Sequence, residues 1–270
     1  MPSLISDRMR RIERELGTAA MGRPTVVLDS VGSTNRWLKE AWSKRQVRHG
    51  TAVWADEQTS GRGRLGRAWE SPPGKNIYTS VLWEPPRERL SGVLSLVAGV
   101  AVARSVRAYT GLDARMKWPN DGVIRGRKFC GILVEAGVDP SPWAVVGIGV
   151  NVLGQVGAEY PNAVTLEQCL SRPVSREDLW LGLMKELEAA YQAWIADGDN
   201  WAVMAWTQHN ATLGHMVRVE KPGQDIWVGR AESVAPDGGL WVANAERREK
   251  VISGEVSLRL ADGGYAPDSD

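Results

Sequence analysis

The chain has 270 residues, 43% of them hydrophobic and 24% charged, which suffices for one well-buried core and a small additional domain. Because 33 Lys and Arg balance 32 Asp and Glu, the net charge offers no attraction to nucleic acid or to an anionic membrane. The first residues are charged and interrupted, and no apolar run approaches about 18 residues. These features predict a cytoplasmic protein with no membrane partner.

The first third of the chain predicts one short helix followed by strands. Apolar residues recur at helical spacing from Ile5 to Leu16, so residues 1–22 have room for one short amphipathic helix. Ser33 is placed to cap a second helix, whose apolar residues share one face. Strands are expected at residues 25–29, 51–55 and 76–83.

The middle of the chain predicts a buried helix and three central strands. Residues 90–110 are apolar on nearly all sides, as in a helix packed against a sheet. Three further apolar segments are separated by polar turns, which indicates strands at the centre of a sheet. These segments are residues 114–118, 131–138 and 143–152.

The last part predicts two helices and then a separate β domain. Ser175 followed by Asp178 resembles a capping box, and a second short helix is expected over residues 199–210. From residue 211, short alternating runs and turn residues indicate a small all-β barrel that ends near residue 263. Residues 264–270 are expected to form a flexible tail.

Cysteine and histidine spacing argues against a structural metal or a disulfide framework. Cys130 and Cys169 lie far apart, and the three histidines form no ligand pattern with them. We expect neither structural zinc nor disulfide bonds.

Residues 61–67, with the sequence GRGRLGR, are the first segment of chemical interest. The three glycines allow positive φ angles and close backbone approach, while the three arginines can converge on anionic oxygen atoms. The spacing matches neither the GxxxxGK[ST] phosphate loop nor the GxGxxG fingerprint. Alone, the segment fits a loop that binds phosphate or carboxylate, a solvated basic loop, or an RG segment that binds nucleic acid.

A second signal is the KWPND segment at 117–121, followed by Lys128. Pro119 interrupts a strand and leaves Asn120 and Asp121 at its tip, where an amide can read a base edge and a carboxylate can hold a cation or a lysine. Lys128 opens the next strand and is expected to face that tip. The alternative is an ordinary hairpin turn with a surface lysine.

A third and weaker signal is the GIGVN segment at 147–151. Gly147 and Gly149 would let a backbone pass close to a ligand, and Asn151 ends the strand.

In chain order these segments resemble the motif series of the biotin-protein ligases, over about residues 25–260. The matching segments are Ser33-Thr34-Asn35, Gln58, GRGRLGR, Trp69, KWPND, KFCGILVE, GIGVN and GEVSLR at 254–259. The resemblance implies an α+β fold, with a mixed β-sheet and flanking helices over residues 23–210, related to class II aminoacyl-tRNA synthetases. A small SH3-like barrel over residues 211–263 would follow.

The resemblance also implies an ATP-dependent ligase with two half-reactions. Biotin and ATP give biotinyl-5'-AMP and pyrophosphate, and a lysine of a biotin carboxyl carrier protein then attacks the acyl-adenylate. ATP and Mg²⁺ are the implied cofactors, biotin is the substrate, and the carrier protein is the acceptor. Family members use strand edges to associate, so the chain is expected to be a monomer or a homodimer.

By position, the resemblance assigns candidate residues to parts of the ligand. The implied biotin-binding residues are Ser33, Thr34, Asn35, Gln58, Gly61, Arg62, Gly63, Arg64, Lys128 and Gly131. The implied ATP- or adenylate-binding residues are Arg64, Arg67, Trp69, Asn120, Asp121, Lys128, Gly149, Asn151 and Arg259. Lys128 and Arg64 are the implied catalytic residues, with Lys128 acting as a cation between two anions rather than as a nucleophile. Asp121 is the candidate Mg²⁺ ligand, with the ion carried by ATP.

Two features depart from the family pattern. Leu65 takes a place that is often arginine. Bifunctional members carry an N-terminal winged helix-turn-helix, which needs at least two helices, whereas one short helix is predicted before residue 25. We therefore expect a monofunctional ligase that does not bind DNA. The alternatives are a lipoate-protein ligase, against which Gln58 and the arginine loop argue, and a nucleic-acid-binding, biotin-responsive repressor.

Overall fold

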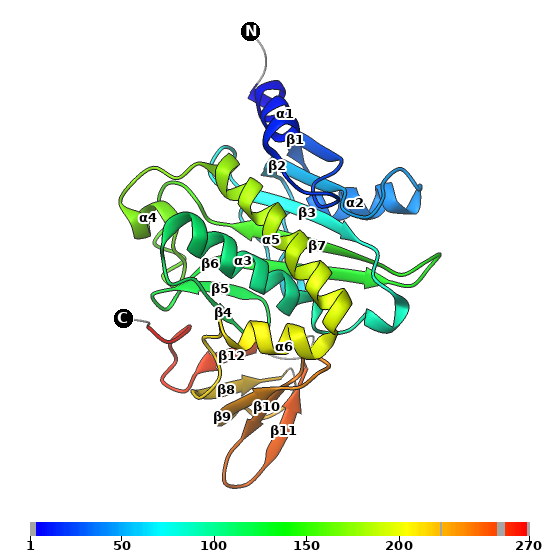
Figure 1. The fold of residues 1–270 in the computed structure, drawn as a ribbon. Coiled ribbons are helices and arrows are strands. Elements are labelled where there is room, and N and C mark those ends of the chain that lie inside the picture. The colour runs from blue at the N-terminus through cyan, green and yellow to red at the C-terminus, as the bar shows by residue number, and fades with distance from the viewer. Residues whose placement is uncertain (1–3, 222, 253–256, 269–270) are drawn as a thin grey trace.

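Helices and strands alternate through the first two thirds of the chain, and a run of strands follows (Figure 1). The computed structural model describes residues 4–221, 223–252 and 257–268. The first part contains α1 (Leu4–Glu15), β1 (Thr25–Val31), α2 (Thr34–Ser43), β2 (Ala52–Gln58), η1 (Arg64–Gly66), β3 (Ile77–Trp83), η2 (Arg87–Arg89), α3 (Leu94–Thr110), β4 (Arg115–Lys117), β5 (Asp121–Ile124), β6 (Arg127–Gly137), β7 (Trp143–Val150), α4 (Leu166–Leu170), α5 (Arg176–Asp197) and α6 (Asp199–Thr207). The second part contains β8 (Met216–Glu220), β9 (Trp227–Val234), β10 (Leu240–Ala243), β11 (Arg248–Val251) and β12 (Ser257–Leu260).

The predicted α+β architecture, a mixed sheet followed by a small β domain, is confirmed. The large sheet has seven strands in the order β1-β2-β3-β7-β6-β5-β4. β1 and β2 run parallel, and the other neighbouring strands of this sheet run antiparallel. The small sheet has five antiparallel strands in the order β11-β10-β9-β8-β12.

β4 lies at the edge of the large sheet, so the prediction of a central strand at residues 114–118 is wrong. The apolar character of this segment is explained by what covers the edge. The backbone N–H of Met116 donates to the carbonyl of His209 at 2.7 Å, and the N–H of Ala211 donates to the carbonyl of Met116 at 2.8 Å. The chain after α6 therefore pairs with β4 and buries it like a central strand.

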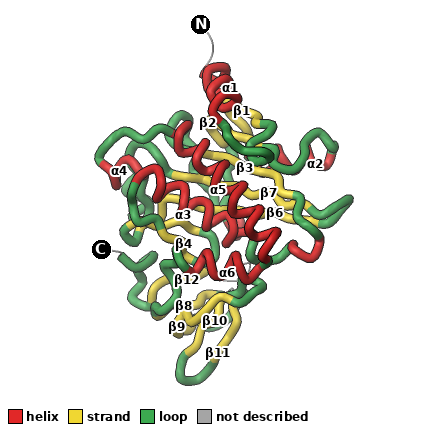
Figure 2. Tube along the Cα trace, in the orientation of Figure 1, coloured by secondary structure: helices red, strands yellow, loops and turns green. Residues whose placement is uncertain are grey.

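Different helices cover the two faces of the large sheet. α3 and α5 pack on each other over one face of the sheet (Figure 2). Trp54 and Val81 belong to the core on that side. α2 covers part of the opposite face, where Leu38 packs with Leu82 and Val145. Because side chains alternate along a strand, neighbouring residues serve the two faces in turn. The remainder of the second face holds the cavity described below.

Helix starts follow the predicted capping chemistry in part. The side chain of Ser175 accepts from the N–H of Asp178 at 3.1 Å, as expected before α5. The full reciprocal capping box is formed instead by Thr165 and Gln168 before α4, a short helix that the sequence analysis did not single out.

The β domain is fixed to the large sheet through the first residues of the KWPND segment. The indole N–H of Trp118 donates to the carbonyl of Gly238 at 3.0 Å, and its backbone N–H donates to Thr212 Oγ1 at 2.8 Å. The ammonium of Lys117 donates to the carbonyl of Leu258 at 3.0 Å. Lys117 and Trp118 therefore serve the domain interface, while Asn120 and Asp121 reach the cavity.

Residues 264–268 are docked against the large sheet, in the segment for which a flexible tail was predicted. Ala266 is buried against Val123 and Ala211, and Tyr265 packs beside this cluster. The Tyr265 hydroxyl donates to a carboxylate oxygen of Asp121. Residues 269–270 lie outside the described part of the chain.

Candidate active site

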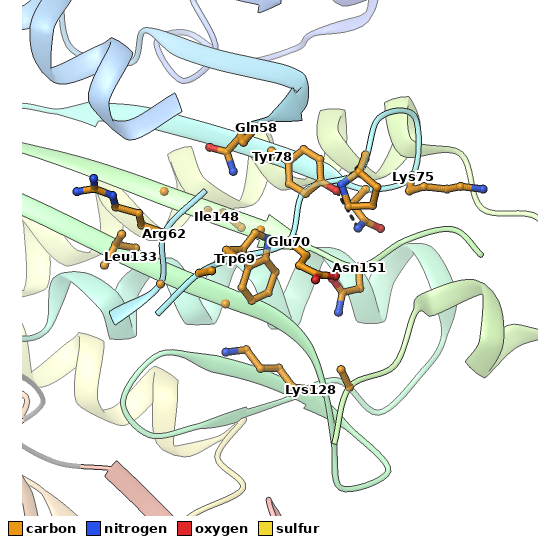
Figure 3. Close-up of a pocket in the computed structure, with 18 of the residues that line it drawn as sticks. Gln58, Arg62, Trp69, Glu70, Lys75, Tyr78, Lys128, Leu133, Ile148 and Asn151 are labelled. Atoms are coloured by element: carbon orange, nitrogen blue, oxygen red, sulfur yellow. Dashed lines mark hydrogen bonds between the residues drawn. The ribbon is translucent and has the colours of Figure 1, made fainter. Parts of the chain in front are cut away.

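A cavity of about 480 Å³ opens on the face of the large sheet that α2 covers in part (Figure 3). Tyr78 of β3 lies opposite Gly149 of β7, which in turn lies opposite Gly131 of β6. This register puts all three residues on one face, and the two glycines leave space above the strands.

The cavity brings together most of the candidate residues, although they are spread over more than a hundred positions. The candidates that line it are Ser33, Thr34, Asn35, Gln58, Arg62, Gly63, Arg64, Arg67, Trp69, Asn120, Asp121, Lys128, Gly131, Gly149 and Asn151.

A network of neutral polar groups surrounds Gln58. The amide oxygen of Gln58 accepts from the backbone N–H of Thr34 at 2.9 Å and from its hydroxyl at 3.0 Å. The amide nitrogen of Gln58 donates to Ser71 Oγ at 3.1 Å. Ser33 stands at the N-cap of α2, as predicted, but its side chain makes no capping hydrogen bond. Gln58 therefore satisfies the first N–H of the helix and holds the start of α2 at the cavity.

Asn35 is held in place from three directions. Its side-chain oxygen accepts from Ser80 Oγ at 2.6 Å, and its nitrogen donates to the carbonyl of Leu133 at 3.2 Å and to Glu135 Oε2 at 3.0 Å. A Cβ atom at Gly147 would stand 2.1 Å from Asn35 Oδ1. Gly147 therefore makes room for the Asn35 amide, whereas the sequence analysis expected it to admit a ligand.

The GRGRLGR segment folds into a short hydrogen-bonded turn beside the cavity. The N–H of Gly63 donates to the carbonyl of Arg67 at 2.8 Å, and the N–H of Trp69 donates to the carbonyl of Gly61 at 3.0 Å. Positive φ angles occur at Leu65 (57°) and at Gly66 (71°). Gly63 has a φ of −104°, so its conformation does not require glycine.

The glycine at position 61 is needed for packing, and Leu65 faces solvent. A Cβ atom at Gly61 would stand 2.5 Å from the carbonyl oxygen of Trp69, and Gly61 is not among the residues that line the cavity. The side chain of Leu65 is exposed. A leucine in the left-handed region is strained relative to glycine or asparagine, which marks this position as a constrained tip of the turn.

The indole of Trp69 lies on the glycine floor of the cavity, above Lys128 in Figure 3. A Cβ atom at Gly149 would come within 2.6 Å of the indole, and one at Gly131 would come within 2.8 Å. The ammonium of Lys128 lies 5.2 Å from the centre of the indole ring. Gly131 and Gly149 therefore leave the space that the indole of Trp69 occupies.

Lys128 forms an ion pair at the tip of the KWPND hairpin, as the sequence predicted. Its Nζ lies 2.6 Å from Asp121 Oδ1. Its backbone is fixed as well, since its N–H donates to the carbonyl of Asn162 at 2.7 Å and its carbonyl accepts from Val164 at 2.9 Å. Burial opposes ionisation of Asp121, but the charges of Lys128 and Lys117 and the hydrogen bonds to Asp121 keep its pKa below the ordinary value.

Asn120 ties the arginine loop to β6. Arg64 Nη1 donates to Asn120 Oδ1 at 3.1 Å, and Asn120 Nδ2 donates to the carbonyl of Ile132 at 2.7 Å. Each polar end of the amide thus has one partner within the protein, which fixes the orientation of the Asn120 side chain. Burial lowers the pKa of Arg64, while the nearby charge of Asp121 opposes that shift.

One residue of the expected ATP site, Arg259, lies away from the cavity. Arg259 does not line it; its guanidinium lies over the ring of Tyr265 at 5.1 Å and donates to the carbonyl of Leu258. In the GEVSLR segment, residues 254–256 lie outside the described part of the chain. Within the described ranges, no group of three or more His, Cys, Asp or Glu side chains gathers as a metal site.

Several polar residues of the site escaped the sequence analysis. Ser80 stands in the strand predicted at residues 76–83 and is buried, and a serine within that strand was the usable signal. Glu135 ends the KFCGILVE segment and pairs with Lys39 at 2.6 Å, but no role was assigned to it. Tyr160 bonds Glu70 across the cavity mouth at 2.7 Å, a contact between distant loops that no local pattern indicates.

The first comparison with known proteins defines a broad class, the protein ligases for biotin or lipoate. Residues 27–151 match the biotin/lipoate A/B protein ligase family, and residues 212–259 match the biotin protein ligase C-terminal domain.

Individual relatives narrow this class. The chain is 32% identical to the biotin–[acetyl-CoA-carboxylase] ligase of Mycobacterium tuberculosis, with 89% of this chain and 91% of that protein covered. It is 30% identical to the bifunctional ligase/repressor BirA of Escherichia coli, with 89% of this chain and 76% of that protein covered. A structure of the Aquifex aeolicus biotin protein ligase in complex with biotin and ATP is similar with a TM-score of 0.77 and 30% identity, covering 88% of this chain and 99% of that one. The chain therefore belongs to the biotin protein ligase family.

Proposed function

We propose that this protein is a biotin–[biotin carboxyl carrier protein] ligase, which forms biotinyl-5'-AMP from biotin and ATP and transfers the biotinyl group to a carrier lysine. The observation that carries the proposal is the cavity itself. A neutral hydrogen-bonding network around Gln58 and a cationic group formed by Lys128 and Arg64 line the same pocket. A neutral polar head group and a carboxylate are the two ends of biotin.

The neutral network suits the ureido ring of biotin. That ring presents two N–H donors and one carbonyl acceptor, which call for fixed amide and hydroxyl partners. Thr34, Asn35 and Gln58 are fixed by their mutual and backbone hydrogen bonds before any ligand enters. Such preorganisation lowers the cost of ordering the site on binding.

The cationic group suits the reacting anions. In the first step, a carboxylate oxygen of biotin forms a bond to the α-phosphorus of ATP, and the bond to the bridging oxygen of pyrophosphate breaks. Two anions approach each other, so a cation between them stabilises the developing charge. We assign this task to Lys128, with Arg64 on the loop as a second cation.

In the second step, the amine of the carrier lysine attacks the carbonyl carbon of the adenylate. The amine loses a proton as the amide bond forms, and AMP leaves with the electrons of the carbon–oxygen bond. We propose that the 61–69 turn and Trp69 retain the adenylate until this attack, with Asn151 and Gly149 near the nucleotide.

Asp121 does not fit the role of a metal ligand. One of its carboxylate oxygens is paired with Lys128, and the other accepts the hydroxyl of Tyr265. We therefore propose that Mg²⁺ is carried by the phosphate oxygens of ATP and by water, as this ion prefers, and no step is assigned to it.

The proposed partner is a biotin carboxyl carrier protein or domain, and the proposed location is the cytoplasm, where ATP is available. None of the helices in residues 4–268 that the structure describes has the length and apolar character needed to cross a membrane. DNA binding is not part of the proposal, since a formal net charge of +1 gives no general attraction to a polyanion.

The test is biotin-dependent exchange of labelled pyrophosphate into ATP, run in parallel with lipoate. Exchange with biotin and none with lipoate is expected. Exchange with lipoate alone would replace the proposal by a lipoate ligase. A salt-sensitive, sequence-selective gel shift with DNA would add a repressor role that the proposal does not contain.

A further inference from the structure

The chain after the last strand of the β domain returns to the catalytic lysine. A turn forms directly after β12: the N–H of Gly263 donates to the carbonyl of Leu260 at 3.0 Å, and the N–H of Leu260 donates to the carbonyl of Gly264 at 2.9 Å. Gly263 has a φ of 89°, which favours glycine at that point. The turn sends residues 265–268 back toward the β4–β6 hairpins.

Ala266 anchors this returning segment through its side chain and through its backbone. Ala266 is buried with Val123 and Ala211 in a small apolar cluster. Its carbonyl oxygen lies close to Gly126, where a Cβ atom would stand 3.0 Å away. The backbone on both sides of Tyr265 is therefore held, which fixes the position of the tyrosine ring.

Two cations lie over the Tyr265 ring. Lys117 Nζ is 4.2 Å and Arg259 Cζ is 5.1 Å from the ring centre. A cation over an aromatic face is attracted to its negative quadrupole. Lys117 comes from the large sheet and Arg259 from the β domain, so the ring fixes the segment to both domains.

The hydroxyl of Tyr265 completes the surroundings of Asp121. It donates to Asp121 Oδ2, while Lys128 Nζ lies 2.6 Å from Oδ1. Burial and the neighbouring charge of Asp121 raise the pKa of Tyr265 well above its ordinary value, so the phenol keeps its proton and remains a donor.

We propose that Tyr265 is a positioning residue for adenylation: by holding one oxygen of Asp121, it keeps the other oxygen on Lys128 and keeps that ammonium directed at the reacting anions. This inference rests on the proposed function. Tyr265 does not line the cavity, whereas Asp121 and Lys128 do, so its effect passes through Asp121 and not through contact with the ligand.

The rotational freedom of the Asp121 carboxylate gives a reason for this arrangement. A carboxylate held by Lys128 alone can rotate about its χ2 torsion and carry the ammonium with it. A second donor on the opposite oxygen fixes the carboxylate plane, and charge-assisted hydrogen bonds of this kind are short and directional. The docked C-terminal segment thereby becomes part of the adenylating machinery, although it lies beyond the β domain.

The test compares Tyr265→Phe with wild type in the full-length chain. The matched control is Tyr191→Phe, which removes another tyrosine hydroxyl, the donor to the carbonyl of Glu84 at 3.2 Å, away from the cavity. Steady-state pyrophosphate exchange at varied biotin and ATP, together with thermal unfolding, gives kcat, both KM values and the melting temperature. We expect kcat of Tyr265→Phe to fall about tenfold, the effect of losing one hydrogen bond to a charged group. Both KM values should stay within about twofold of wild type, and Tyr191→Phe should retain wild-type kcat.

A double-mutant cycle with Asp121→Asn, measured by single-turnover adenylate formation, tests the route of the effect. If Tyr265 acts through Asp121, adding Tyr265→Phe to Asp121→Asn changes the rate little, because the carboxylate to be held is gone. If the rate losses of the two single variants simply multiply in the double variant, the proposal is overturned. It is also overturned if Tyr265→Phe keeps the wild-type kcat, whether or not its KM values change. A wild-type chain that shows no biotin-dependent exchange would instead overturn the proposed function.

Discussion

Gly147 and Gly149 lie two residues apart on β7 and make room for different side chains, which allows a paired test of the two ends of the cavity. Gly147→Ala would put a methyl group 2.1 Å from Asn35 Oδ1, and Gly149→Ala would put one 2.6 Å from the indole of Trp69. Ordinary contacts begin at 3.4 Å. Since both methyl groups are attached to a central strand, the side chains must retreat, Asn35 by about 1.3 Å (3.4 less 2.1) and Trp69 by about 0.8 Å (3.4 less 2.6).

The size of the Gly147→Ala effect follows from the bonds of Asn35. Retreat of the amide breaks its bonds to Ser80 Oγ and to the carbonyl of Leu133, as well as the bond to the Glu135 carboxylate. A neutral hydrogen bond contributes about 1 kcal/mol and one to a charged group about 2 kcal/mol, so the free energy of unfolding should fall by about 2–4 kcal/mol. If Asn35 binds the ureido ring, the biotin KM should rise about tenfold or more.

The assay is pyrophosphate exchange with biotin and ATP varied separately, with urea unfolding as the measure of stability. Gly147→Ala is expected to raise the biotin KM and to leave the ATP KM within about twofold. Gly149→Ala should do the opposite, because Trp69 lies on the proposed nucleotide side. If Gly147→Ala unfolds near the wild-type urea concentration and keeps the wild-type biotin KM, the assignment of Asn35 is refuted. Equal changes in both KM values for both variants would refute the separation of the two ends.

Three further predictions concern the charged groups. Lys128→Ala should lower the adenylation rate by about a hundredfold to a thousandfold, the effect of removing one preorganised cation or donor; circular dichroism should show an unchanged fold, and a near-wild-type rate would contradict the assigned role. Arg64→Gly should release biotinyl-5'-AMP faster, because it removes the hydrogen bond from the loop to Asn120. The rate at which biotin appears on lysines of added albumin measures this release. Release at the wild-type rate would mean that the loop does not retain the adenylate. The pKa of Asp121 lies below its ordinary value, so the contribution of its carboxylate to stability is present above about pH 4 and is lost as the pH falls through the lowered pKa. Urea unfolding should therefore show a smaller loss of stability in acid for Asp121→Asn than for wild type. Equal losses of stability would argue against a stabilised carboxylate.

The sequence indicated the candidate residues because each motif is local. Lys117 to Lys128 form two consecutive hairpins, so the meeting of Lys128 with Asp121 follows from neighbouring strands and short turns. The arginine loop and the polar start of α2 likewise stand at strand ends, where side chains collect at one edge of a sheet. The motif series then limited the reaction to a biotin ligase, which no single motif did.

The sequence by itself determined the α+β class, the separate β domain and the identity of most residues around the cavity, since periodicity and turn residues act over a few positions. Only the tertiary structure decided the contacts between residues that are far apart in the chain. The edge position of β4 depends on strand order, and its apolar character on the segment at 209–211 that covers it. Asn35 meets Glu135 across 100 positions, and Tyr265 meets Asp121 across 144. Contacts over such separations depend on how the strands are ordered and how the domains dock, and no short pattern in the chain encodes either.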